Sequence, residues 1–185
     1  MGSVTCLSLG LILVCTVAVA AGAPTLAQTL DGRFLNEERD IVPLIEAMPA
    51  DKFDFAPTAG EFRGVRTFGQ QARHMATTIY LMSSSILEQN PPVDTGTTEE
   101  GPAARQTKDQ IIEYVKGAFR FGHRALLSLT EKNQMDMTAS PLGGAKQARI
   151  GSAVFMMYHS YDHYGQMVEY LRMNGLIPPS TQSGR

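Results

Sequence analysis

A helix-start pattern that occurs twice, each time ahead of a stripe of apolar or small residues, constrains the fold most. Thr67 is followed three positions later by Gln70, and Thr107 by Gln110, which is the spacing of a capping box. Residues suited to one helix face then recur three or four positions apart. They are Phe68, Ala72, Met75, Ile79, Met82 and Ile86 after the first box, and Ile111, Val115, Ala118, Gly122 and Ala125 after the second. The two predicted helices cover about residues 67–90 and 107–129.

Two further helices complete the predicted fold. One covers about residues 33–48, with Pro43 as a kink or a late start. Its expected opening residues are Asn36, Glu37 and Glu38. The other follows a loop over residues 131–146 and runs to Asn174, where Gly175 is placed to end it in the left-handed conformation. Since no segment shows convincing strand alternation, the fold class is all-α, an antiparallel four-helix bundle.

The N-terminal segment predicts export. The first thirty residues carry no charged side chain, and Leu7 to Ala21 form an apolar run followed by small residues. This is typical of a signal peptide over residues 1–27, with cleavage after Ala20 or after Ala27. The run is short for a membrane span, and an uncleaved anchor is the alternative. We therefore expect a bacterial protein that is periplasmic or secreted, free of the membrane after cleavage, with one folded domain over residues 30–180.

Cysteine content and charge exclude several classes. Both cysteines, Cys6 and Cys15, lie in the predicted signal peptide, so the rest of the chain has no disulfide, thiol nucleophile or thiolate ligand. Any metal ion must be bound by nitrogen and oxygen. The chain has 16 basic and 18 acidic residues and no run of Lys or Arg. Nucleic-acid binding, which needs clustered positive charge, is not expected.

His159 and His163 are the strongest candidates for chemistry. Residues four apart on a helix lie one above the other, so both imidazoles can reach one ion. The alternative is that both rings make ordinary local hydrogen bonds. The pair lacks the glutamate of the His-Glu-x-x-His zinc-protease pattern, and no Glu-x-x-His pair of the di-iron bundles occurs. His74 lies beside the apolar stripe of its own predicted helix, where it could reach a neighbouring helix.

The last predicted helix has two sides of different composition. One side is an apolar stripe made of Ile150, Val154, Met157, Tyr161, Tyr164, Val168 and Leu171. His159 and His163 fall on roughly the opposite side, which is mixed rather than charged. One side is expected to face the other helices, and the other a cleft or a second subunit. A homodimer is therefore a candidate assembly.

The chain resembles the DinB-like family of DNA-damage-inducible bundle proteins, which includes thiol-dependent transferases. The resemblance spans roughly residues 36–180 and is carried mainly by residues 48–80 and 156–180. The specific parts are the histidine of the second helix, the His-x-x-x-His pair, and the Leu-Arg-x-x-Gly-x-x-Pro-Pro run that follows. In that family three histidines bind a divalent ion, so the resemblance implies His74, His159 and His163 as ligands. His123 has no counterpart in that triad and is expected to be structural or on the surface.

Three neutral imidazoles would leave a coordination position open, as in catalytic zinc sites, and nitrogen ligands suit zinc, nickel or iron. Further contacts could come from Asp162, Gln166, Tyr80 and Tyr158. The expected function is a metal-dependent hydrolase or transferase with a small-molecule substrate. Export favours water over a thiol as nucleophile, because thiols are kept reduced chiefly in the cytoplasm.

The alternative function is a non-catalytic bundle that binds metal or a partner in the cell envelope. A deep pocket with polar groups at the open position would favour catalysis, and a sealed site a structural role. Segment 91–106, rich in Pro, Gly and Thr, is predicted to be an exposed loop, long enough to be a lid or simply mobile.

Overall fold

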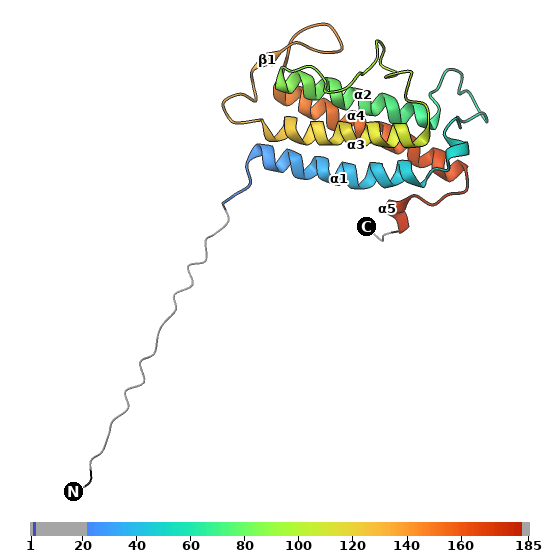
Figure 1. Cartoon of the computed structure of the whole chain (residues 1–185), viewed down its shortest axis with the longest axis horizontal. Coiled ribbons are helices and arrows are strands. Elements are labelled where there is room, and N and C mark those ends of the chain that lie inside the picture. Colours follow the sequence, from blue (N-terminus) through green and yellow to red (C-terminus); the bar gives the residue numbers. More distant parts are fainter. Residues whose placement is uncertain (1, 3–21, 183–185) are drawn as a thin grey trace.

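The computed structural model describes residue 2 and residues 22–182 of the chain. In this part four long helices lie side by side as a bundle (Figure 1), which confirms the predicted all-α fold. They are α1 (Leu26–Ala47), α2 (Phe68–Leu87), α3 (Lys108–Leu127) and α4 (Arg149–Met173). Shorter elements are the 3-10 turn η1 (Ala50–Lys52), the strands β1 (Met137–Thr138) and β2 (Gln147–Ala148), and α5 (Pro179–Gln182). No helix among the described residues is long and apolar enough to cross a membrane.

The first helix begins at Leu26, so the predicted start near Arg33 is wrong. A third capping box starts it: the Gln28 amide donates to Thr25 Oγ1 at 3.2 Å, and the Thr25 amide to Gln28 Oε1 at 2.9 Å. Asn36, Glu37 and Glu38 therefore lie inside the helix, as does Pro43.

The predicted signal peptide lies mostly outside the described residues. Cleavage after Ala20 would keep the Thr25 box, whereas cleavage after Ala27 would remove it together with the first residues of α1.

The second and third helices begin at the predicted capping boxes, and their stripes form much of the core. Gly122 in the stripe of α3 allows a close approach to α1. A Cβ atom there would lie 2.5 Å from Cε1 of Phe34, a fully buried side chain of α1. Only glycine allows the two helices to pack this closely without displacement.

Neighbouring helices differ in direction. α2 runs antiparallel to α4, since Gln71 bonds to Gln166 and Ser83 to Met156. α2 runs parallel to α3, because Gly69 packs against Ile111 and Gly122 against Ile79. Both helices have 20 residues, about 30 Å, and the chain must travel that length back before α3 can begin. Residues 88–107 make this crossover, which explains the long loop in the sequence (Figure 1).

A short hairpin precedes the last helix, and the sequence did not predict its strands. β1 and β2 pair antiparallel, with Met137 opposite Ala148. The helix then starts without a side-chain cap, but its first amides have backbone partners: Arg149 N donates to Asp136 O at 3.1 Å and Ile150 N to Gln134 O at 2.9 Å. At the other end Gly175 has a φ of 74°, as predicted for a left-handed terminator.

The histidine side of α4, rather than the predicted apolar stripe, carries most of its buried residues. The stripe members Val154 and Tyr161 are 49% and 42% exposed. The buried residues are Ser152, Ala153, Met156, Ser160, His163, Met167, Tyr170 and Leu171. Small serines allow close packing there, and the tyrosines of the stripe can keep their hydroxyls in water.

Glu37 makes the stability of the bundle depend on pH. Its side chain is 1% exposed, Oε2 has no hydrogen-bond partner among the described residues, and burial raises its pKa from 4.5 to about 8. The pKa of Glu37 is higher in the folded than in the unfolded protein. The contribution of the protonated Glu37 to the free energy of unfolding is therefore complete below pH 4.5 and is lost as pH rises towards 8. Glu37→Gln, which cannot ionise, should remove this dependence.

We expect the stability of Glu37→Gln relative to the native chain to increase by roughly 1.4 kcal/mol per pH unit across this window. Urea unfolding of both proteins at several pH values measures the difference, and groups common to both cancel. A difference that is constant with pH would show that Glu37 does not titrate in this range.

Candidate metal centre

The fold brings three histidines together. His74 comes from α2, and His159 and His163 come from α4, which crosses beside it in the antiparallel direction. Their ring centroids are 4.8 Å apart for His74 and His163, 5.1 Å for His74 and His159, and 4.5 Å for the α4 pair. One ring nitrogen from each lies within 4.8 Å of the others, so the three residues could hold a metal ion.

A backbone carbonyl sets the orientation of the His74 ring. Nδ1 of His74 lies 2.6 Å from the carbonyl oxygen of Glu99, in the crossover. Because a carbonyl oxygen only accepts, Nδ1 carries the proton and Nε2 presents its lone pair. That Nε2 is 3.1 Å from Nε2 of His159, which also lies 3.2 Å from Thr78 Oγ1. The nitrogens of two helices thus point at a common space.

A relay of amides orients His163 in the same way. The carboxylate of Asp162 accepts from Gln166 Nε2 at 3.1 Å, so Oε1 of Gln166 accepts from Gln71 Nε2 at 2.8 Å. Oε1 of Gln71 then accepts from Nδ1 of His163 at 2.5 Å. The direction of every bond follows from the carboxylate, and it leaves Nε2 of His163 unprotonated.

Burial keeps the two α4 histidines neutral. It lowers the pKa of His159 from 6.5 to about 4, with a further contribution from the neighbouring His74. It lowers the pKa of His163 to about 3, where His159 adds to the effect. At neutral pH both rings have a free lone pair, which is the form that binds metal.

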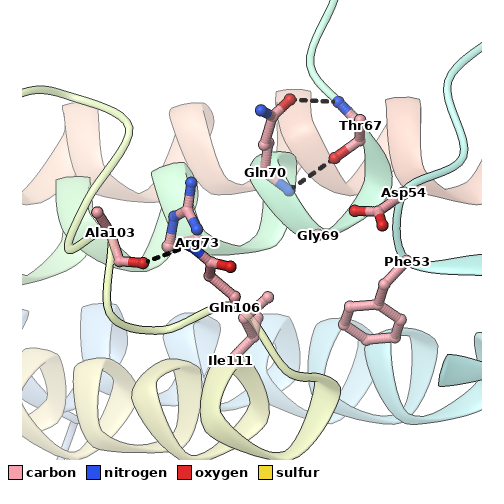
Figure 2. Close-up of a pocket in the computed structure, with 9 residues that line it drawn as sticks. All are labelled: Phe53, Asp54, Thr67, Gly69, Gln70, Arg73, Ala103, Gln106 and Ile111. Atoms are coloured by element: carbon pink, nitrogen blue, oxygen red, sulfur yellow. Dashed lines mark hydrogen bonds between the residues drawn. The ribbon is translucent and has the colours of Figure 1, made fainter.

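Arginines of the α2 region anchor the crossover beside the histidines. Arg73 donates to the carbonyls of Glu100 at 2.7 Å and Arg105 at 3.0 Å, and Arg66 pairs with the carboxylates of Glu99 and Glu100. Figure 2 shows Arg73 next to Ala103, at one side of a hollow of about 230 Å³. The part of the loop that holds the Glu99 carbonyl is therefore fixed by several contacts.

The three histidines line one cavity of about 420 Å³. Its remaining lining comes from α2, α4 and three loops, those before α2, before α3 and before α4: Arg66, Thr78, Leu81, Glu99, Leu142, Phe155, Asp162 and Gln166. Polar groups thus converge on an open space beside the ring nitrogens. The geometry is that of an accessible centre and not of a sealed one.

Two of the four further residues expected near the histidines lie at the cavity, and two do not. Asp162 and Gln166 line the cavity as proposed. Tyr80 and Tyr158 do not: Tyr80 is 2% exposed in the core, and Tyr158 is 57% exposed. Gln71 was missed, although it precedes His74 by three positions and so shares its helix face.

His123 lies apart from this cluster. Its Nδ1 is 2.6 Å from Asp31 Oδ1 and its Nε2 is 3.2 Å from Glu38 Oε2, both on α1. These contacts join α3 to α1, in keeping with the structural role expected for it.

Comparisons with known proteins agree with the fold. A family model described as the DinB superfamily matches residues 33–167. A crystal structure of a DinB-like protein from Bacillus cereus ATCC 10987 is 18% identical, with a TM-score of 0.61 over 79% of this chain and 93% of that chain. A conserved protein from Enterococcus faecalis is 15% identical, with a TM-score of 0.63 over 81% and 97%. At such identity these structures show a shared fold. No curated protein matches the chain.

Proposed function

The chain belongs to the DinB superfamily, and on this premise we propose that His74, His159 and His163 bind one divalent metal ion at which a small-molecule substrate is hydrolysed. The observation that carries the proposal is the direction of the ring nitrogens. Glu99 and Gln71 accept the Nδ1 protons of His74 and His163, which leaves Nε2 of both rings unprotonated. Such outer hydrogen bonds are typical of histidines that bind metal.

Three neutral nitrogen ligands suit zinc, nickel or iron, and such an ion supplies Lewis acidity and lowers the pKa of a water molecule that it binds. The residues of the chain would position the ligands. Gln71 and the Glu99 carbonyl hold the rings in position. Arg66 and Arg73 keep the crossover in place, so the ligands are preorganised before substrate binds.

The cavity favours catalysis over the alternative of a non-catalytic bundle that binds metal or a partner in the cell envelope. A structural ion is normally enclosed by four protein ligands, whereas here three ligands border about 420 Å³ of open space. Polar side chains at that space, Asp162 and Gln166 among them, offer hydrogen bonds to a substrate.

We further propose export to the periplasm or the medium, supported by the uncharged, apolar N-terminal segment. Export favours hydrolysis over transfer to a thiol, because such cosubstrates are scarce in reduced form outside the cytoplasm.

We also propose a homodimer. It is supported by three exposed apolar or aromatic side chains of α4 that a second copy could cover: Val154, Tyr158 and Tyr161.

Metal analysis combined with an ester and amide hydrolysis screen tests the function. We expect about one divalent ion per chain, hydrolysis that stops on treatment with a chelator, and recovery on addition of zinc, nickel or iron. Since removal of the ion removes the acid that activates water, the loss should exceed about 100-fold. A protein that retains its ion and hydrolyses no substrate would favour the non-catalytic bundle, and hydrolysis that survives metal removal would exclude the proposed mechanism.

A further inference from the structure

The cavity at the three histidines has two chemically different ends. The antiparallel register of α2 and α4 sets their positions, because Gln71 lies opposite Gln166 and Thr78 opposite His159. Arg66 comes before His74 along the chain and Leu81 after it. On α4, Gln166 and Asp162 therefore lie towards the start of α2 and Phe155 towards its end. The ends are defined by their residues: the polar end by Arg66, Glu99, Asp162 and Gln166, and the apolar end by Leu81, Phe155 and Leu142.

Carboxylates outnumber the one arginine at the polar end, so the charge there is negative. The Arg66 guanidinium pairs with both Glu99 and Glu100 at 2.8 Å, and Asp162 adds a further carboxylate nearby. An anionic group would have to compete with two carboxylates for the one arginine. This end therefore suits a neutral or hydrogen-bonding part of a ligand.

The apolar end is formed by side chains from three separate segments. Phe155 stacks on the His159 ring, with centroids 5.3 Å apart and an interplanar angle of 15°. Leu81 follows His74 by seven positions on α2, which places it about 10 Å further along the helix axis. Leu142, from the loop before α4, is 53% exposed although it borders the cavity. No charged side chain of the described residues lines this end.

We propose that the centre takes an amphipathic small molecule whose polar reacting group lies at the histidines and whose apolar part extends along Leu81, Phe155 and Leu142. This rests on the proposed metal-dependent function. Burying an alkyl or aryl group there would remove both the ligand and the three side chains from water, and this gain scales with the apolar area covered. Leu81 lies about 10 Å from His74 along the axis of α2, so the preferred group is medium-sized rather than a single methyl.

Alkyl hydroxamates, which bind metal through two oxygens and differ only in chain length, provide the probe. The zinc-loaded protein is titrated calorimetrically with acetohydroxamate and with hexanohydroxamate. Since each methylene that is buried strengthens binding severalfold, we expect the longer compound to bind roughly tenfold to a hundredfold more tightly. Leu81→Asn combined with Leu142→Asn should reduce this ratio to about threefold or less and leave acetohydroxamate binding unchanged.

Leu127→Asn is the matched control, because Leu127 is 54% exposed on α3 and does not line the cavity. It should keep the full ratio. If acetohydroxamate binds but the longer chain brings no gain, or if the double variant keeps the gain, the apolar end is not a ligand site and the inference is overturned while the metal centre stands. If zinc is not retained, or neither compound binds to the zinc-loaded protein, the proposed function and the inference both fail.

Discussion

Replacing His159 and His163 together with alanine is expected to abolish metal retention while the helical bundle remains folded. The change removes two of three nitrogen donors, and His74 alone cannot hold an ion against water. We expect the affinity for the metal ion to fall by more than about 100-fold, which exceeds the loss typical when only a hydrogen-bond partner of a metal ligand is mutated. Oε1 of Gln71 would lose the hydrogen bond that it accepts from His163. This loss would lower the free energy of unfolding by about 1–3 kcal/mol, which is too little to unfold a typical domain.

Metal content per chain and circular dichroism are measured on the same preparations. His123→Ala provides the control, since it also removes a histidine but one that contacts Asp31 and Glu38 away from the cluster. The control should keep its ion. Metal content that is unchanged in the double variant would reject the three-histidine centre.

A large loss of stability is expected when the contact between α1 and α3 is disturbed. Gly122→Ala would place a methyl group 2.5 Å from Cε1 and 2.8 Å from Cζ of Phe34, and 3.3 Å from Cγ2 of Ile79. Phe34 is fully buried and packs on Phe119 with ring centroids 4.9 Å apart, so it has little room to move. We expect a loss of about 1–3 kcal/mol in the free energy of unfolding, measured with urea.

Two further variants separate steric conflict from helix propensity. Gly165→Ala on α4 meets nothing within 4 Å, and it should be neutral or stabilise by up to about 1 kcal/mol. Phe34→Leu combined with Gly122→Ala should be less destabilised than the sum of the single changes, because the smaller side chain makes room for the methyl group. Strict additivity would show that the two residues do not compete for space.

The fold could be predicted where local chemistry and burial agree. The Thr67 and Thr107 boxes and the stripes behind them gave two helices correctly, because the capping hydrogen bonds are made within four residues. The Thr25 box has the same form but lies inside the uncharged N-terminal segment that was predicted as a signal peptide, so α1 was predicted to start too late. The direction of α3 depends on long-range packing at Gly69 and Gly122, which periodicity does not report.

The three-histidine centre could also be predicted only in part, because some of its contacts are long-range. His159 and His163 are near each other in sequence, and helical geometry alone brings them together. His74 was assigned through the family resemblance, since nothing in its own segment specifies the register against α4. The Glu99 contact is made by a backbone carbonyl, so no side-chain pattern could indicate it.

The start of α4 ties the cavity to the hairpin in front of it. Three long helices are preceded by a threonine whose side chain bonds to the first turn, but α4 is preceded by Ala148, which has no such side chain. The carbonyls of Gln134 and Asp136 take that role from outside the helix. Shortening the hairpin in an engineered variant would leave the leading amides of α4 exposed to water, so fraying would begin there and travel towards Phe155. Loop grafts meant to change ligand preference near Leu142 should therefore keep the 134–136 segment intact.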